Sequence, residues 1–479
     1  MTRLADDRYG SAMALRSADD YIAGLTDGRR VHYRGKTIDD VTAEPDLRVA
    51  IDHAALDFRM AHDPTHADLT VAEIDGEPCS AYFAPPRDAD DLLRRSKLIE
   101  TVTAEGGTMV TLVKEIGSDA IFGLSRILEG EQLERLQAFH RRCYEGDLAV
   151  AVAQTDTKGN RALPPTEQPD QYVRVVDRTS EGIVVRGAKS HTSVSVNSDE
   201  LMVLPTRAMK DDAGDFSVAF AVPMDTEGLH LYVSNYGAGD KDSFSFPLSS
   251  RYKMLETLTV FDDVFVPWDR VFLDNDPSMA GPVASAFVEY HRFTAVSYKL
   301  PLIDAFVGAA AAIAQMNGVP RAAHIREKVT ELMRYAETVR SLTELAAYRC
   351  DVSRGIARPD PLTTNLAKYT FATGYHQALQ LVQDCAGGLL VTGPGGEDWD
   401  DPETRAVLER YHSAAVPAEE RLRMLNMIAD LTVRDFGGYH AVLAVHAEGS
   451  IEAEKRHLFQ HFPLERTVEY AKKLADPDT

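Results

Sequence analysis

The chain has 479 residues, of which 44% are hydrophobic and 26% charged, a composition typical of a folded protein. Its length predicts two or three domains or one large composite unit. Its formal net charge of −23 argues against nucleic acid as a partner, because binding to a phosphate backbone needs a surface rich in Lys and Arg. The cysteines Cys79, Cys143, Cys350 and Cys385 are scattered, which excludes a disulfide framework and argues against a cysteine-ligated metal or cluster.

The amino-terminal residues 1–20 contain several acids and no apolar signal core, so we expect no export signal and a cytoplasmic protein. The longest apolar run, 305–316, is shorter than a bilayer span. It predicts a core helix, and we expect no membrane partner.

Helical patterns joined by short turns dominate up to residue 147, which predicts a mainly helical N-terminal domain over 1–147. A Ser-Ala-Asp-Asp segment before Tyr21 has the spacing of a helix cap. The predicted elements are a capped helix over 17–27, a small hairpin over 30–38, and helices over 45–60 and 90–103.

Short Val-rich and alternating stretches follow, separated by Gly, Asp, Asn and Pro, and they predict a central β domain over 148–275, a barrel or a sandwich. Within it the stretch 182–200 reads GIVVRGAKSHTSVSVNSDE, with strand-like pieces around a segment dense in hydroxyls and amides. This stretch fits either a polar hairpin or the wall of a small-molecule site. A donor-rich turn, QTDTKGNR, opens the domain and ends in an Arg that could hold an anionic or carbonyl-rich ligand.

Long helical patterns return beyond residue 282 and predict a helical bundle over 276–479. On a helix, His291 and Tyr298 share one face and Lys299 lies nearly on it. Such a His and Lys could position or protonate a substrate, although a lone His on a helix also fits a structural role. The paired glycines of 383–388, QDCAGG, fit close approach to a cofactor or a helix end.

The commoner site motifs are absent from the sequence. There is no GxGxxG, no GxxxxGKS/T, no HExxH and no GxSxG elbow, so a Rossmann nucleotide site, a zinc hydrolase and a serine hydrolase are not predicted.

Taken in order, the segments TDTKGNR, IVVRGAKSHTSVSVNS, VFDDVFVPWDR, YHR, CAGGLLVT and PAEERLRML resemble the 4-hydroxybutyryl-CoA dehydratase and 4-hydroxyphenylacetate 3-monooxygenase family. The resemblance extends over about 19–450. It implies a multidomain α+β fold of the acyl-CoA dehydrogenase type, with an N-terminal helical domain, a central β-barrel domain and a C-terminal four-helix bundle. A homotetramer or homodimer is expected.

The resemblance also implies FAD, held between the β domain and the bundle, with Ser193 near the reactive edge of the ring. Hydroxyls suit that edge because they can hydrogen-bond flavin nitrogens in either redox state. The residues expected at the cofactor are Thr155, Asp156, Arg161, His191, Thr192, Ser193, Gln383, Gly387 and Gly388.

The chain departs from the dehydratase branch at its iron–sulfur ligands. The ligating histidine corresponds to His291, but the three cysteine positions fall at Thr111, Glu115 and Tyr298, which cannot supply thiolate. We therefore expect no iron–sulfur cluster and no other metal. The active-site tyrosine corresponds to Ala295, and the C-terminal glutamate, near 446–450, to an apolar residue or alanine.

The match to the monooxygenase branch is also incomplete. Its catalytic histidine corresponds to Val152, and its substrate-side Arg and Tyr fall around Gly107 and Thr111. A phenol-hydroxylating site must then be built from other groups. The catalytic candidates are His291, Lys299, Glu256 and Tyr298.

The first functional hypothesis is an enzyme, a two-component flavin-dependent monooxygenase that takes reduced FAD from a separate reductase and hydroxylates a small aromatic, phenolic molecule. One alternative is a cluster-free, FAD-dependent acyl-CoA dehydratase, isomerase or dehydrogenase, in which Glu256 abstracts a proton beside the thioester. Another is a catalytically silent flavin-binding scaffold.

Overall fold

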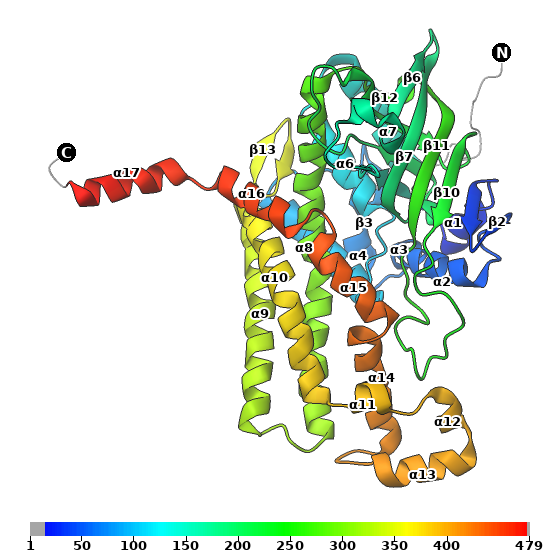
Figure 1. Ribbon diagram of the computed structural model, residues 1–479, viewed down its shortest axis with the longest axis vertical. Helices are drawn as coiled ribbons and strands as arrows, with labels where there is room; N and C mark the ends of the chain where they lie inside the picture. Colours follow the sequence, from blue (N-terminus) through cyan, green and yellow to red (C-terminus); the bar gives the residue numbers. More distant parts are fainter. Residues whose placement is uncertain (1–14, 477–479) are drawn as a thin grey trace.

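The computed structural model describes residues 15–476; residues 1–14, which carry most of the export-signal prediction, lie outside this range, as do 477–479. Figure 1 shows the strands gathered at one end of the molecule, with long helices running along its length. The last helix, α17 (Leu464–Ala475), extends away from the body.

The N-terminal part is mainly helical, as predicted. Ser17 caps the first helix through a reciprocal pair of hydrogen bonds with Asp20, and the hairpin predicted over 30–38 is present. The helix predicted over 45–60 is interrupted at Ala55. The elements are α1 (Ala18–Gly24), β1 (Arg30–Tyr33), β2 (Lys36–Ile38), α2 (Pro45–Ala54), α3 (Leu56–Ala61), α4 (Ala67–Thr70), β3 (Val71–Ile74), β4 (Glu77–Ser80), α5 (Ala89–Glu105), α6 (Glu115–Ser125) and α7 (Gly130–Glu145).

The β region consists of two open sheets. The six-stranded sheet has the order β2-β1-β10-β11-β7-β6 and so includes the N-terminal hairpin, while the four-stranded sheet has the order β12-β9-β8-β5. The further strands are β5 (Val150–Ala153), β6 (Arg174–Arg178), β7 (Gly182–Ser193), β8 (Glu200–Val203), β9 (Ala219–Pro223), β10 (Leu229–Val233), β11 (Glu256–Pro267) and β12 (Val271–Leu273).

The resemblance implied a closed β-barrel, but residues 15–476 do not form one. Closure requires the first and last strands of a sheet to pair, whereas β2 and β6 lie at opposite edges of the larger sheet. The two sheets instead contact each other face to face, for example through the edge-on rings of Phe220 in β9 and Phe261 in β11, with centroids 5.9 Å apart. This matches the sandwich alternative.

The hydroxyl-rich stretch 182–200 is not a hairpin. Strand β7 continues through the polar segment to Ser193, and β8 begins at Glu200 in the other sheet. The backbone is left-handed at His191 (φ 56°), within β7, and at Val194 (φ 55°), directly after it. The polar end of β7 therefore lies where one sheet passes into the other.

The C-terminal part is built on three long helices, α8, α9 and α10, which pack against one another, and the shorter α14 packs on α8 and α10. Whether these form a four-helix bundle of the implied type stays a prediction, as do the domain boundaries at 147/148 and 275/276. The elements are α8 (Pro277–Met316), α9 (Ala323–Tyr348), β13 (Asp351–Ser353), β14 (Ile356–Arg358), α10 (Pro361–Ala386), α11 (Leu389–Thr392), α12 (Gly396–Asp400), α13 (Pro402–His412), α14 (Ala418–Thr432), α15 (Asp435–His446) and α16 (Ile451–His461).

Helix α8 is the central element of the fold. It is the one described helix long and apolar enough to cross a membrane, but 67% of its most apolar window is buried inside the protein, as in a core helix. Helices α5, α6, α9 and α10 surround it, so every residue from Tyr290 to Ile303 is buried. This segment includes His291, Arg292 and Lys299. Buried charges are costly unless they are paired, so their partners mark a candidate site.

Candidate active site

Three of the predicted catalytic residues, His291, Tyr298 and Lys299, lie on the buried middle of α8, and the fourth, Glu256, begins strand β11. Each forms a specific polar contact with a residue from a different element. The contacts divide into three groups, around Asp119, Glu448 and Glu256.

His291 forms a dyad with Asp119 of α6. The Nδ1 atom of His291 lies 3.1 Å from Oδ2 of Asp119, and the imidazole stacks on Phe287 with ring centroids 5.0 Å apart. Asp119 is completely buried, and its Oδ1 accepts hydrogen bonds from Arg95 (2.8 Å) and Thr294 (2.9 Å). With Nδ1 held by the carboxylate, Nε2 is the nitrogen left for proton transfer.

Sequence reasoning missed Asp119. Its sequence signal is an acid directly before the apolar run AIFGL of α6, because a carboxylate that enters a core needs a partner.

Lys299 is paired with Glu448, a residue of the segment between α15 and α16. Lys299 Nζ donates to Glu448 Oε2 at 2.7 Å, the Tyr298 hydroxyl donates to the other oxygen, and Lys368 Nζ lies 3.7 Å away. Burial lowers the pKa of Lys299 to about 8 although Glu448 opposes the shift. Burial alone would raise the pKa of Glu448, but the charges of Lys299, Lys368 and His291 lower it to about 2.

Glu448 was also missed. The sequence comparison predicted a replaced glutamate near 446–450, yet this stretch does supply a carboxylate, which the fold brings to Lys299 from 149 positions away.

Glu256 lies between the polar end of β7 and helix α15. Ser193 Oγ donates to both carboxylate oxygens, at 2.9 and 3.0 Å, and the Tyr439 hydroxyl donates to Oε1 at 2.6 Å. Burial raises the pKa of Glu256, while the hydrogen bonds from Tyr439 and Ser193 act in the opposite direction.

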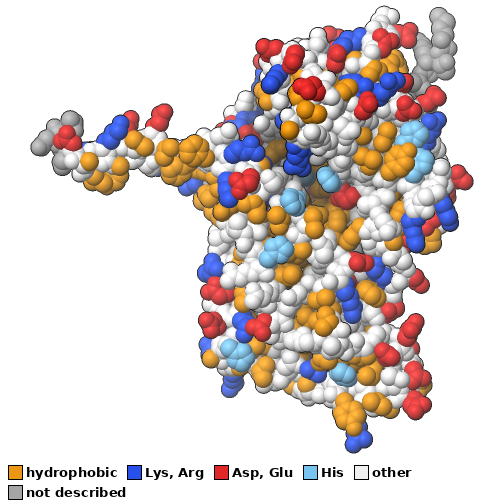
Figure 2. Space-filling model, in the orientation of Figure 1, with side chains coloured by type: hydrophobic (Ala, Val, Ile, Leu, Met, Phe, Trp, Pro, Cys, Tyr) orange, Lys and Arg blue, Asp and Glu red, His pale blue; other side chains and the backbone are white. Residues whose placement is uncertain are grey.

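A small cavity of about 10 Å³, room for about one water molecule, adjoins Tyr298 and Lys299. Its walls are mostly apolar and come from the 106–114 loop, α8, α10 and α15. The lining residues are Thr108, Tyr298, Lys299, Leu302, Phe371, His440, Leu443 and Ala444. Figure 2 shows histidine side chains beside a hollow on the face where the sheets meet the helices.

The residues expected at the flavin differ in their burial and in their hydrogen-bond partners. Thr192 is completely buried, and its Oγ1 has no hydrogen-bond partner within residues 15–476. Thr155 lies beside the same segment, because its carbonyl accepts the Ser190 N–H at 2.8 Å. An unpartnered buried hydroxyl at the end of β7 fits a ligand that accepts or donates a hydrogen bond there, as the edge of a flavin ring does.

Other predicted flavin residues are engaged elsewhere or exposed. Asp156 forms a buried ion pair with Lys189 at 2.9 Å, and Gln383 donates to the Thr432 carbonyl at 3.0 Å. Direct flavin contacts by these two residues stay predictions. Arg161, His191, Gly387 and Gly388 are exposed, and open space surrounds both glycines at the end of α10.

At the positions that correspond to the dehydratase's cluster cysteines, this chain has side chains with hydroxyl or carboxyl groups. Thr111 donates to Glu115 at 3.1 Å, and Tyr298 contacts Glu448. Cys79, Cys143, Cys350 and Cys385 are free thiols on β4, α7, the α9–β13 connection and α10. Among the described residues, no group of three or more His, Cys, Asp or Glu side chains could hold a metal ion.

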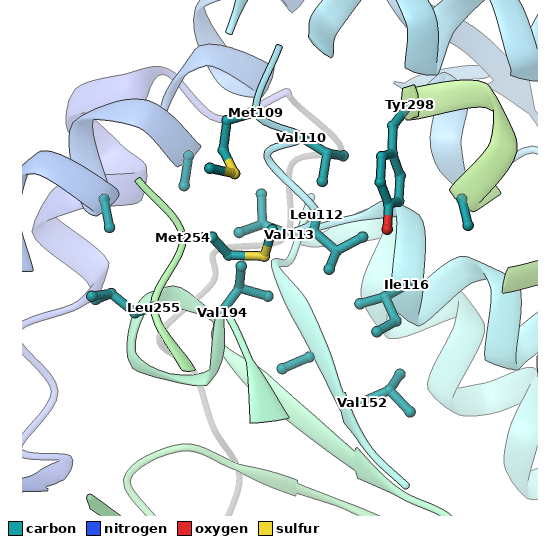
Figure 3. Packing of buried hydrophobic residues seen from close by; sticks show 14 of the residues in the cluster. Met109, Val110, Leu112, Val113, Ile116, Val152, Val194, Met254, Leu255 and Tyr298 are labelled. Atoms are coloured by element: carbon teal, nitrogen blue, oxygen red, sulfur yellow. The ribbon is translucent and has the colours of Figure 1, made fainter. Parts of the chain in front are cut away.

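The position of the monooxygenase histidine is part of an apolar cluster. Figure 3 shows Val152 close to Ile116, with the Tyr298 ring alongside Val110, Leu112 and Ile116. All of these side chains are buried.

Comparison with known proteins gives matches over nearly the whole chain. Residues 17–273 match the family described as 4-hydroxyphenylacetate 3-hydroxylase N terminal, and residues 280–476 match 4-hydroxyphenylacetate 3-hydroxylase C terminal. The 4-hydroxybutyryl-CoA dehydratase/vinylacetyl-CoA-Delta-isomerase of Clostridium aminobutyricum is 29% identical over 488 residues, 96% of this chain and 99% of that protein. The 4-hydroxyphenylacetate 3-monooxygenase oxygenase component of Thermus thermophilus is 28% identical over 430 residues, 88% and 89% of the two chains.

Solved structures agree. The oxygenase component of 4-hydroxyphenylacetate 3-monooxygenase complexed with FAD superposes with a TM-score of 0.91 at 26% identity, covering 96% of this chain and 98% of that one. Butyryl-CoA dehydrogenase of Megasphaera elsdenii, at 13% identity and a TM-score of 0.52 over 92% and 97% of the chains, shares the fold alone. The multidomain α+β fold of acyl-CoA dehydrogenase type is therefore confirmed.

Proposed function

Because the chain belongs to the 4-hydroxyphenylacetate 3-hydroxylase family, as its resemblance indicated, we propose that it is a reduced-flavin-dependent monooxygenase that hydroxylates a small phenol. The observation that carries the proposal is the chemistry at Thr111, Glu115 and Tyr298. These positions offer hydroxyl and carboxyl groups in place of thiolates, so iron–sulfur-dependent dehydration is not supported.

Thr155, Thr192 and Ser193 would hold the flavin ring at the end of β7, with Thr192 supplying its unpartnered hydroxyl. Bound reduced FAD would supply two electrons to O2, so that one oxygen atom enters the phenol ring and the other leaves as water. The relatives named as oxygenase components support a separate reductase as the source of reduced FAD. A cytoplasmic homotetramer or homodimer belongs to the same proposal.

His291 would serve as the base that takes the phenol proton. Its Nε2 accepts that proton while Asp119 holds Nδ1 and stabilises the imidazolium. Lys299, already paired with Glu448, would lie beside the phenol oxygen without adding free positive charge. The apolar side chains around Tyr298 exclude water from this ion pair.

The reaction is tested with isotopically labelled O2. The purified protein is supplied with FAD and an NADH-dependent flavin reductase, and a panel of phenols, amino-acid-derived aromatics and acyl-CoAs is offered. We expect one labelled oxygen atom in a phenolic product, and none when the protein is omitted. An acyl-CoA converted without oxygen uptake, or iron and sulfide found in the purified protein, contradicts the proposal.

A second candidate function is cluster-free chemistry on an acyl-CoA. It is favoured by Glu256, a buried carboxyl whose pKa burial raises, because such a group can remove a proton beside a thioester. The dehydratase relative supports this candidate. The substrate panel above separates it from hydroxylation.

Asp119→Asn is expected to lower kcat about tenfold to 100-fold and leave KM within about twofold, because the amide no longer fixes the productive His291 tautomer. Steady-state kinetics on the hydroxylated phenol measures both values. Asp384→Asn, which alters an exposed carboxylate of α10, is the control and should keep normal kinetics. If Asp119→Asn changes KM alone, Asp119 does not act through the base.

A further inference from the structure

Two side chains that line the cavity beside Lys299 carry buried polar atoms without partners. Thr108 Oγ1 and His440 Nε2 are both buried, and neither forms a hydrogen bond within the described part of the chain, although both side chains line the cavity. An unpaired buried polar group is destabilising, so such a pair at one cavity points to a missing ligand.

The charge around the cavity limits the ligand to a neutral group. Lys299 is neutralised by Glu448 at 2.7 Å, and Lys368 is paired with Glu454. Burial and the charge of Lys299 lower the pKa of His440 to about 3, so its ring is uncharged at neutral pH. A carboxylate would find no free cation here. A hydroxyl, which donates and accepts, can satisfy both a threonine hydroxyl and a neutral imidazole nitrogen.

The remaining walls are apolar and suit a ring. Leu302, Phe371, Leu443 and Ala444 line the cavity beside the two polar atoms. Three lining residues, His440, Leu443 and Ala444, belong to α15, which rests on α10 and α14. Because the present volume holds about one water molecule, a ring enters only if the cavity widens.

The phenol-binding groups of the monooxygenase branch cannot be used here. An Arg at position 107 is excluded, because Gly107 has a φ of 61° and the Tyr252 ring lies 2.2 Å from the place of a β-carbon. Val152 belongs to the apolar cluster near Ile116. The chain therefore needs other groups for a substrate hydroxyl.

We propose that Thr108 and His440 bind the hydroxyl of a neutral phenol in the cavity next to Lys299. This assignment rests on the proposed function, for which it names the substrate-binding residues. Neither residue was singled out from the sequence.

Binding of defined phenols tests the assignment apart from turnover. Phenol, p-cresol, 4-nitrophenol and 4-hydroxyphenylacetate, each paired with its O-methyl ether, are titrated calorimetrically into the FAD-loaded protein without reductant. The variants are Thr108→Val and His440→Leu. Thr103→Val is the matched control, because Thr103 Oγ1 is likewise buried without a partner among residues 15–476 but does not line the cavity.

We expect the wild-type protein to bind at least one phenol more tightly than its ether. Thr108→Val and His440→Leu should each weaken that phenol about threefold to tenfold and leave the ether unchanged, as loss of one hydrogen bond predicts. Thr103→Val should bind like the wild type. Unchanged phenol binding in both cavity variants, or binding of none of the phenols, overturns the assignment.

The outcomes also separate this assignment from the proposed function. Phenol binding that depends on Thr108 and His440, without oxygen incorporation, rejects the monooxygenase and keeps the binding site. Hydroxylation with normal phenol binding in both variants rejects the site alone.

Discussion

Replacing His291 by alanine is expected to lower kcat about 10²- to 10⁴-fold, the usual contribution of a general base, while flavin affinity changes by less than about twofold. Asp119 holds Nδ1 of the imidazole at 3.1 Å and leaves Nε2 for the substrate proton, so removal of the ring leaves that proton without an oriented acceptor. Phenol hydroxylation rates and equilibrium FAD binding measure the two effects.

The matched control is His376→Ala, which removes an exposed histidine from α10 and should leave turnover unchanged. Parallel loss of FAD binding in His291→Ala would indicate a structural role. Near-normal turnover would show that another group is the base. Lys299→Ala is then the next variant to measure.

Glu448→Ala is expected to lower the free energy of unfolding by about 3–5 kcal/mol, because it leaves Lys299 buried without its carboxylate. Urea unfolding at neutral pH measures the loss. The double variant Lys299→Met/Glu448→Gln should recover much of it, since both charges are then removed. Glu419→Gln, which breaks the exposed pair with Arg423, is the control and should change stability by less than about 1 kcal/mol.

The same pair predicts a pH dependence. The pKa of Glu448 is lowered from 4.5 to about 2 in the folded protein, so its stabilising contribution is complete above pH 4.5 and disappears as the pH falls toward 2. The difference in unfolding free energy between wild type and Glu448→Gln should shrink over this window. A difference that is constant down to pH 2 would contradict the ion pair.

Local patterns predicted the elements better than their partners. The capping signal at Ser17 and the helical spacing over 90–103 are properties of neighbouring residues, and both helices are present. The partners of β7 and of β8 are strands that lie elsewhere in the sequence. Sequence adjacency suggested a hairpin there, whereas β7 pairs with β11 and β6.

The candidate site shows the same division. The resemblance pointed to His291 and Lys299, but Asp119 and Glu448 are 172 and 149 positions away from them in the chain. Charged residues at such separations become partners only through the packing of α6 and the α15–α16 segment on α8. Thr108 and His440 had no local signal, because an unpaired polar atom exists only once a core surrounds it.

His291 and Lys299 lie on one uninterrupted helix, α8, whereas their partners come from different elements. Eight residues of α-helix fix them about 12 Å apart along a rigid axis. Asp119, the partner of His291, belongs to α6, which is packed tightly on α8, whereas Glu448, Tyr439 and His440 all come from α15 and the residues just after it. The site thus has one half built on α6 and α8, which contains the base, and another half that depends on the position of α15. A displacement of α15 would open the cavity and alter the charge environment of Lys299 without disturbing the base.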